Sequence, residues 1–596
     1  MSTPAARTDA KIVATASVEQ LRGRLRKKSQ LKGRQPDHAA MTEVQELIGA
    51  GPHRRDLLIE NLHKLNDFHR GLHDRHLVAL ARQMNIPMAE VYEVATFYHH
   101  FEVLRDGQEP ARVTVRVCDG LSCEMRGARE LLQRLPAMLG GDVRVIATPC
   151  VGRCEQAPVA VVDQAPVLNA DAAHVQSAVE RSSITHPLAA DDGSFDAGAA
   201  GPSPVTASPA EVSPAYVGLR AYRAKGGYQL AARVSSGALS VNDVIKALSD
   251  SGLRGLGGAG FPAGRKWGIV RQQPAPRLMA VNIDEGEPGT FKDRTYLERD
   301  PHRFLEGLLV AAQVVGTEAC YIYLRDEYHG CRAILERELE LLRADPPFPL
   351  PHIELRRGAG AYICGEESAM IESIEGKRGE PRMRPPYIAQ IGLFGKPTLE
   401  HNFETLYWVR DIVERGPAWF GSFGRNGRKG LRSYSVSGRV REPGVKLAPA
   451  GISLRELVDE FCGGMLPGHE LYAYLPGGAS GGILPAHLAD VPLDFDTLQP
   501  HGCFIGSAAV IVLSDKDRAR DAALNMMRFF EHESCGQCTP CRVGTGKAAR
   551  LMTAEKWDHE TLEDLNQVMV DASICGLGQA APNPVRCVQK YFPDEV

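Results

Sequence analysis

The sequence lacks the long apolar segments that are typical of membrane proteins. No run of about 18 apolar residues occurs in the 596-residue chain, so we expect no transmembrane helix. The N-terminus has no apolar stretch of the kind found in secretory signals, and we therefore expect a cytoplasmic setting. The chain also has no strong excess of charge of one sign. Its formal net charge is -4, so the overall charge does not indicate nucleic-acid binding.

The sequence shows no internal repeat, and its length is too great for one hydrophobic core. Domains of roughly 100–200 residues predict about three to five units. Composition shifts and hydrophobic periodicity indicate a multidomain α/β and α+β protein. The predicted segments are a basic extension (1–40), a helical segment (41–105), a small α/β domain (106–182), a linker (183–214), an α/β domain (215–428), a small α+β domain (429–514) and a helical domain (515–596).

Two of these segments have little to bury. Residues 1–40 are rich in Lys and Arg, and a disordered or partly helical tail is the favoured interpretation; a docking arm for a partner subunit and a transit peptide are the alternatives. Residues 183–214 are rich in Ala, Gly, Ser, Pro and Asp, which is typical of a flexible linker.

Local patterns support the domain types. Leu58, Leu62 and Leu65 follow helical spacing, whereas Val113, Val115 and Val117 alternate like a strand. A helix around Leu131 to Leu135 and apolar strands near Val143 and Val159 then give a β-α-β-β order, which suits a small α/β domain.

Eight of the 14 cysteines fall into two groups, and without a secretory signal we interpret them as metal ligands rather than disulfides. The front cysteine group pairs Cys118 and Cys123 as C-x4-C with Cys150 and Cys154 as C-x3-C, each pair following a predicted strand. Four thiolates there could hold a [2Fe-2S] cluster. A zinc site, or four unrelated buried cysteines, is the alternative.

The rear cysteine group combines the C-x2-C-x2-C motif of Cys535, Cys538 and Cys541 with the distant Cys575. Three close thiolates plus a remote one is the arrangement of a [4Fe-4S] cluster. Zinc is again the alternative. The remaining cysteines are interpreted as packing residues: Cys320, Cys331, Cys364, Cys462, Cys503 and Cys587.

Glycine-rich loops concentrate in 215–428. Residues 255–260 satisfy G-x-G-x-x-G, but the preceding Val244–Gly252 stretch looks helical, which argues against a Rossmann fold. Phe261 could stack on a ring, and Arg265 and Lys266 could meet phosphates. Two further loops, Asn282–Asp293 and Gly358–Ser368, combine glycines with carboxylates that could accept hydrogen bonds from ribityl or ribose hydroxyls. Together the three loops favour a nucleotide-type site.

The G-x-S-x-G segment at Gly478–Gly482 has a different interpretation. A hydrolase elbow needs a helix directly after the serine, and Pro485 argues against one. We predict a tight turn there.

These motifs together resemble the NADH-oxidising module of respiratory complex I and its relatives. The motifs that carry the resemblance are Arg254–Trp267, Asn282–Asp293, Gly358–Ser368, Glu533–Arg542 and Ser573–Gly578. By resemblance, 106–182 is a thioredoxin-like [2Fe-2S] domain and 215–428 an FMN/NADH-binding domain. Residues 429–514 would be ubiquitin-like (soluble-ligand-binding-like), and 515–596 a helical [4Fe-4S] bundle. The two halves are similar to the 24 kDa-type and 51 kDa-type subunits, fused across the linker.

Among such relatives, the fused layout is similar to the beta subunit of bacterial NAD-dependent molybdenum or tungsten formate dehydrogenase. Leu431–Val440, Ala473–Pro485 and Pro492–Leu498 carry this likeness, together with the complete front cysteine group. It implies a molybdenum- or tungsten-pterin partner subunit that oxidises formate and holds further iron–sulfur clusters. A subunit of an NAD-reducing hydrogenase or of complex I is the alternative. An alternative of a different class is a zinc-stabilised scaffold without a redox role.

The resemblance also implies site residues. FMN would be held by Gly255, Gly257, Gly258, Asn282, Asp284, Glu285, Tyr362, Gly365, Glu366, Asn402 and Thr405. NADH would stack on Phe261 and Tyr387, with polar contacts from Lys266, Glu287 and Glu367. One position departs from the relatives, which carry a second asparagine where this chain has His401. The departure concerns one flavin contact. No side chain is expected to act as a catalytic acid or base, because the flavin itself exchanges the hydride.

Overall fold

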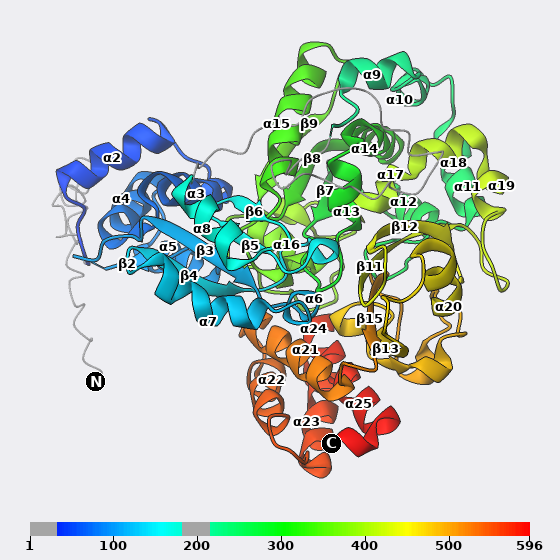
Figure 1. Ribbon diagram of the computed structural model, residues 1–596. Helices are drawn as coiled ribbons and strands as arrows, with labels where there is room; N and C mark the ends of the chain where they lie inside the picture. The colour runs from blue at the N-terminus through cyan, green and yellow to red at the C-terminus, as the bar shows by residue number, and fades with distance from the viewer. Residues whose placement is uncertain (1–32, 106, 182–214) are drawn as a thin grey trace, which may run out of the picture.

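The computed structural model describes residues 33–105, 107–181 and 215–596 (Figure 1). Most of the predicted basic extension and the whole predicted linker lie outside these ranges. Within them, a group of N-terminal helices, three separate four- or five-stranded sheets and a C-terminal group of helices follow one another along the chain. None of the helices in these ranges is long and apolar enough to cross a lipid bilayer.

The N-terminal helices begin earlier than the sequence predicted. The first helix in the described ranges, α2, starts at His38, inside the segment interpreted as an extension, because the Asp37 side chain accepts a hydrogen bond of 2.7 Å from the Ala40 nitrogen and caps the helix. The predicted leucines of the next helix, Leu58, Leu62 and Leu65, are buried. This segment consists of α2 (His38–Ile48), α3 (Leu58–His69), β1 (Leu72–His73), α4 (Asp74–Met84), α5 (Met88–Phe97) and β2 (Val103–Leu104).

The first large sheet has the order β4-β3-β5-β6, with β3 and β4 parallel and the other pairs antiparallel. Val113, Val115 and Val117 face its core as their alternation predicted. Its elements are β3 (Val113–Cys118), α6 (Leu121–Glu124), α7 (Ala128–Leu139), β4 (Val143–Thr148), β5 (Ala160–Val162), β6 (Ala165–Val167) and α8 (Ala172–Glu180).

The second sheet is fully parallel, in the order β10-β7-β8-β9. Helix α14 packs against it and is buried along nearly its whole length, which explains its almost continuous apolar sequence. The stretch before the G-x-G-x-x-G motif is indeed helical, as α11. The main elements are α11 (Val241–Ser251), α12 (Ala263–Arg271), β7 (Arg277–Ile283), α13 (Lys292–Leu297), α14 (Pro301–Val315), β8 (Thr317–Leu324), α15 (His329–Ala344), β9 (His352–Arg357), α16 (Glu367–Ile374), β10 (Thr398–Asn402) and α17 (Phe403–Tyr407).

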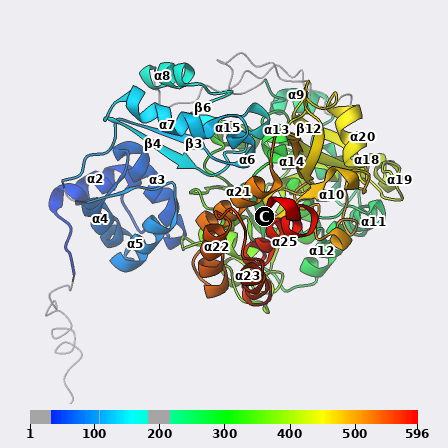
Figure 2. The same cartoon turned by 60° about the horizontal axis from the view of Figure 1, so that its bottom comes forward.

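The third sheet has the order β12-β11-β15-β13-β14, and the C-terminal helices follow it. These helices lie below the first and third sheets in Figure 1 and come forward in Figure 2. The strands are β11 (Leu431–Gly438), β12 (Gly444–Pro449), β13 (Leu471–Leu475), β14 (Leu484–Pro485) and β15 (Ala509–Ser514). The helices are α21 (Ala519–Glu533), α22 (Thr539–Leu551), α23 (His559–Ala572), α24 (Gly576–Ala580) and α25 (Pro582–Tyr591).

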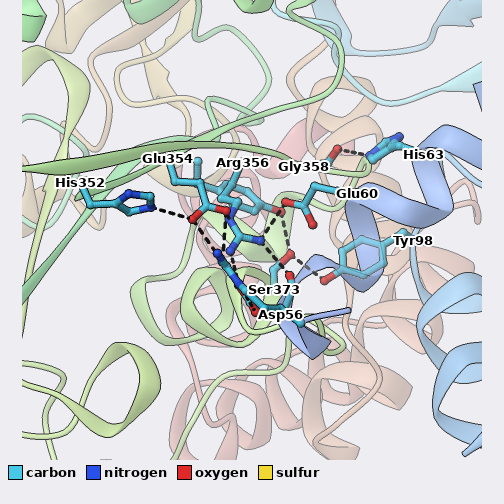
Figure 3. A network of polar contacts seen from close by, with 11 residues as sticks. Asp56, Glu60, His63, Tyr98, His352, Glu354, Arg356, Gly358 and Ser373 are labelled. Carbon is cyan, nitrogen blue, oxygen red and sulfur yellow. Dashed lines mark hydrogen bonds and ion pairs between the residues drawn. The ribbon is translucent and has the colours of Figure 1, made fainter. Parts of the chain in front are cut away.

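A buried polar network joins the N-terminal helices to the parallel sheet (Figure 3). Arg356 on β9 forms ion pairs with Asp56 and, at 3.1 Å, with Glu60. The Tyr98 hydroxyl donates to Ser373 at 2.8 Å, and the His63 ring contacts the Gly358 carbonyl at 2.8 Å. The guanidinium of Arg356 is almost fully buried, so this network fixes the helical segment against the loop that follows β9.

Candidate functional site

The front cysteine group comes together where β3 and β4 end. Cys118 is the last residue of β3, and the loop after β4 carries Cys150 and Cys154. The thiols of Cys150 and Cys154 lie 3.3 Å apart, and Cys123 and Cys150 are close enough to the Cys118 thiol to raise its pKa well above the usual value. All four side chains are buried. The structure therefore assembles the four thiols that the spacing predicted, in an arrangement suited to an iron–sulfur centre.

The rear cysteine group also occupies one place. Cys541 lies in the first turn of α22, and Cys575 directly precedes α24. Cys535 is close enough to both of them to act on their charge. Gly578 has no side chain at a point where a Cβ would stand 2.9 Å from the Cβ of Cys541. The remaining six cysteines are buried, as packing residues should be.

A cavity of about 360 Å³ lies at the carboxyl ends of β7 and β10. We call it the sheet-edge cavity. Most of the residues that the resemblance assigns to FMN line this cavity, and so does Glu287, which it assigns to NADH. The predicted residues in the lining are Gly257, Gly258, Asn282, Asp284, Glu285, Glu287, Tyr362, Gly365, Glu366 and Asn402. Open parallel sheets typically bind ligands at this edge. The three glycine-rich loops thus meet at one site.

Backbone glycines make room on one wall of this cavity. A Cβ on Gly257 would stand 3.0 Å from the Cβ of Asn402. Gly258 has a φ of +125°, which residues with side chains rarely adopt. The close packing and the unusual backbone explain why glycine occupies these positions.

Asn282 and Asp284 line the cavity at the carboxyl end of β7. The Asn282 amide donates to the Gly365 carbonyl at 2.9 Å and accepts from the Asp284 nitrogen at 2.9 Å. One carboxylate oxygen of Asp284 is buried and has no hydrogen-bond partner among the described residues. Burial raises the pKa of Asp284 well above its usual value. A buried polar atom without a partner fits a ligand that offers a hydroxyl or N–H group, as FMN does.

A charged group that the sequence analysis left without a role, Lys292, also lines the cavity. Lys292 pairs with Asp293 at 2.6 Å and with Glu404 at 3.1 Å. Burial opposes the charge on Lys292, but the carboxylates of Asp293, Glu404 and Glu285 outweigh it and raise the pKa. Asn402 donates to Asp293 at 2.6 Å. Lys292 therefore brings a permanent cation to a site that would receive a phosphate-bearing group.

Glu285 titrates near neutrality. Its carboxylate accepts hydrogen bonds from the nitrogens of Asp293 (2.8 Å) and Arg294 (3.1 Å) and from the Tyr328 hydroxyl (2.8 Å). Burial and the nearby charge of Asp293 raise the pKa of Glu285 to about 7. The cavity therefore contains a carboxyl that holds a proton part of the time at physiological pH.

Glu287 connects the cavity to the third sheet. It accepts from the Ser480 nitrogen at 2.9 Å and from the Ser507 hydroxyl at 3.1 Å. Ser480 belongs to the G-x-S-x-G segment, which is a turn with a short 3-10 helix rather than a hydrolase elbow. Sequence reasoning missed Ser480 and Ser507 as cavity residues because they come from another domain.

The cavity also reaches the rear cysteine group. Gly576 and Leu577 line it and directly follow Cys575 in the chain. Tyr362 on the cavity wall donates its main-chain N–H to Glu533, two residues before Cys535, at 2.9 Å. The C-x2-C-x2-C motif and its remote partner therefore lie against the glycine-rich loops, which neither pattern alone could predict.

The remaining predicted residues lie outside the cavity lining. Gly255 and Thr405 hold the first glycine loop: the Gly255 nitrogen donates to the Phe261 carbonyl at 2.8 Å, and the Thr405 hydroxyl accepts from the Leu256 nitrogen at 2.9 Å. Phe261 and Tyr387 are 40% and 57% exposed, as rings that await a stacking partner should be.

Charged side chains near these rings are paired with one another. Lys266 forms an ion pair of 2.6 Å with Glu400, and Arg384 pairs with both Glu366 and Glu367. Glu366 also caps α16. His401, the position that departs from the relatives, is buried and lies 2.6 Å from the Trp267 nitrogen, so it supports the sheet instead of lining the cavity.

Three family descriptions match separate parts of the chain. "Thioredoxin-like [2Fe-2S] ferredoxin" matches residues 44–183, "Nuo51 FMN-binding domain" matches 248–411, and "NADH-ubiquinone oxidoreductase-F iron-sulfur binding region" matches 521–596. The first range contains the front cysteine group, the second contains the three glycine-rich loops, and the third contains the rear cysteine group. The matches favour iron–sulfur clusters over the zinc alternative at both cysteine groups.

Curated relatives agree with these matches. The chain is 44% identical over 394 residues to the F 2 subunit of the NADH-quinone oxidoreductase of Rhizobium meliloti (strain 1021), covering 63% of this chain and 93% of that protein. It is 41% identical over 372 residues to the mitochondrial NADH dehydrogenase [ubiquinone] flavoprotein 1 of Dictyostelium discoideum, covering 59% and 78%.

A structural likeness extends over both halves. An NAD+-reducing [NiFe]-hydrogenase in the H2-reduced state contains a chain that superposes with a TM-score of 0.76 and 31% identity, covering 91% of this chain and 93% of that one. The protein therefore belongs to the family of NADH-oxidising flavoprotein subunits found in NADH-quinone oxidoreductases, and it carries an FMN-binding domain, a thioredoxin-like [2Fe-2S] domain and a [4Fe-4S] region.

Proposed function

We propose that this chain is the diaphorase subunit of an NAD-dependent molybdenum or tungsten formate dehydrogenase. It would transfer electrons between iron–sulfur clusters and NAD+/NADH through FMN, and would reduce NAD+ with electrons from formate oxidised on a partner molybdenum or tungsten subunit. The observation that carries the proposal is the lining of the sheet-edge cavity, which combines Tyr362 and Glu285 with Gly576 and Leu577, the residues next to Cys575. A flavin in this cavity would be in contact with the residues beside the rear thiolates.

The chain's own residues bind and orient the reactants in this proposal. Gly257 and Gly258 allow close approach of the ring, Asp284 accepts its hydrogen bonds, and Lys292 supplies positive charge. Phe261 and Tyr387 offer exposed rings for stacking of NADH. When bound, FMN supplies the conversion between a hydride, which carries two electrons, and the single electrons that iron–sulfur clusters accept.

Glu287, which the resemblance assigns to NADH, lines the cavity and is held there by residues of the third-sheet region. Its carboxylate already accepts from Ser480 and Ser507 and is buried. We therefore propose that it also holds the turn at Ser480 against the cavity, beside the polar contact with NADH that the resemblance implies.

Formate as the distal donor is supported by the likeness of Leu431–Val440 and Ala473–Pro485 to the formate dehydrogenase beta subunit. Part of the second stretch, at Ser480, lines the cavity. A complete front cysteine group, with all four thiols in one place, is a second argument. The likeness to a hydrogenase chain over 91% of the sequence supports a hydrogenase diaphorase as the second candidate.

Metal analysis of the native complex separates these candidates. Molybdenum or tungsten that co-purifies with the chain in a fixed ratio is the expected result. Nickel that co-purifies in a fixed ratio instead of molybdenum or tungsten would overturn the formate assignment and support the hydrogenase.

The isolated chain provides a second test. It should reduce artificial dyes with NADH and show no reaction with formate, because its sequence contains no region that resembles a molybdopterin domain. Formate oxidation by the isolated chain would contradict the proposed division of labour between subunits.

A further inference from the structure

Three histidines gather between the N-terminal helices, outside the sites described above. His69 ends α3, His73 directly precedes α4, and His76 lies in the first turn of α4. The ring centroids of His69 and His76 are 4.1 Å apart. The His73 ring centroid lies 5.4 Å from that of His76 and 6.1 Å from that of His69.

Two nitrogen atoms in this cluster are buried without a partner. They are Nε2 of His69 and Nδ1 of His76, and neither has a hydrogen-bond partner in the described part of the chain. The side chain of His76 is fully buried. Buried polar atoms normally find a partner, so two unpaired ring nitrogens on adjacent imidazoles indicate that a ligand is missing.

Glu43, on α2, accounts for the orientation of one ring. Its carboxylate accepts a hydrogen bond of 2.6 Å from Nε2 of His76 and a second one of 2.8 Å from Arg75. A proton held on Nε2 leaves the lone pair on Nδ1, which is the unpartnered atom. A carboxylate behind an imidazole in this way is the usual support of a metal-binding histidine. Ligand atoms of Glu43, His69 and His76 all lie within 4.8 Å of one another.

We propose that Nε2 of His69 and Nδ1 of His76 bind a divalent transition-metal ion of the zinc type, with Glu43 as the carboxylate that orients His76. Imidazole nitrogens suit zinc, and water molecules would complete a tetrahedral set. The ion would tie together α2, α3 and α4, which lie side by side in Figures 1 and 2. Its role is structural and separate from the redox centres.

The test uses the full-length protein with its flavin and clusters in place, dialysed against buffered micromolar Zn²⁺. Zinc and iron are then counted by mass spectrometry. The wild type should hold one zinc ion more than His69→Gln at equal iron content, since equal iron excludes zinc in the cysteine groups. Zn²⁺ should also raise the melting temperature of the wild type and not that of the variant.

Two further variants sharpen the result. Glu43→Gln should weaken zinc binding roughly 10- to 100-fold, because it removes the support of a ligand. His174→Gln, at an exposed histidine on α8, should bind zinc like the wild type. His69 is partly exposed, so its substitution is tolerated more readily than that of buried His76. Equal zinc in wild type and His69→Gln, at equal iron, would overturn the proposal.

Discussion

The main-chain nitrogen of Tyr362 donates a hydrogen bond of 2.9 Å to a carboxylate oxygen of Glu533. Tyr362 lines the sheet-edge cavity, and Glu533 ends α21 two positions before Cys535. One bond therefore joins the third glycine-rich loop to the segment that carries the rear cysteine group. It fixes the spacing between the proposed flavin and the proposed [4Fe-4S] cluster, and such supporting contacts keep functional groups in productive geometry.

Replacing Glu533 by alanine should loosen this connection. The buried acceptor is lost and the Tyr362 N–H is left unpaired, which costs roughly 1–3 kcal/mol of stability. We expect slower reduction of the rear cluster by NADH in stopped-flow absorbance, with less effect on direct reduction of dyes. Glu531→Ala, at an exposed glutamate of the same helix, is the control. A wild-type rate in Glu533→Ala would show that the bond has no such role.

Gly258→Ala should impair flavin binding. Its φ of +125° strains any residue with a side chain by about 1–3 kcal/mol, and relief of the strain shifts the cavity wall. We expect FMN to bind about tenfold more weakly, measured by flavin fluorescence after ultrafiltration.

The matched control for this change is Gly237→Ala. Gly237 has a φ of +77° with open space around it and lies away from the cavity. Alanine at position 237 must also adopt a positive φ and is strained for the same reason. Equal loss of flavin from both variants would therefore show that the effect comes from general destabilisation.

Glu285 should make stability depend on pH. Its pKa rises from 4.5 to about 7 in the folded protein, so the folded state holds this proton more tightly than the unfolded chain. The stabilisation is fully present below about pH 4.5 and is lost as the pH rises through about 7. Glu285→Gln should therefore flatten the decline of the melting temperature between about pH 5 and 8. The control is Glu340→Gln, at an exposed glutamate. If the melting temperature of Glu285→Gln fell with pH as steeply as that of the control, the assignment would be contradicted.

Arg356→Met should release the N-terminal helices from the parallel sheet. The variant leaves the carboxylates of Asp56 and Glu60 without their buried partner (Figure 3), which costs about 3–5 kcal/mol. We expect faster proteolysis within α2 to α5 while the flavin is retained. Arg337→Met, at a half-exposed arginine of α15, is the control. Equal cleavage rates in the two variants would argue against this role.

Short sequence patterns predicted the features that are determined by residues close together in the chain. The spacing of Cys535, Cys538 and Cys541 sets which thiols can reach one point, and the valines of β3 show which face is buried. The helical interpretation of Val244–Gly252 correctly excluded a Rossmann turn, because periodicity along a short segment is a local property.

Other features depend on tertiary contacts. Ser480, Ser507 and Leu577 line the cavity from segments far along the chain, and nothing in their local sequence marks them as cavity residues. The start of α2 at His38 was missed because a basic composition concealed the cap at Asp37. Lys292 lies inside the Asn282–Asp293 motif, but its role depends on its ion pairs with Asp293 and Glu404 in the folded protein.

The most direct test of the account follows the reduction of the rear cluster by NADH. Low-temperature electron paramagnetic resonance of the anaerobic protein, frozen after mixing with NADH, should show a reduced [4Fe-4S] signal in the wild type. In Cys575→Ser that signal should be absent while NADH still bleaches the flavin, because the fourth thiolate is missing and the cavity remains. An identical cluster signal in Cys575→Ser, or none in wild-type protein that holds flavin and iron, would contradict the account.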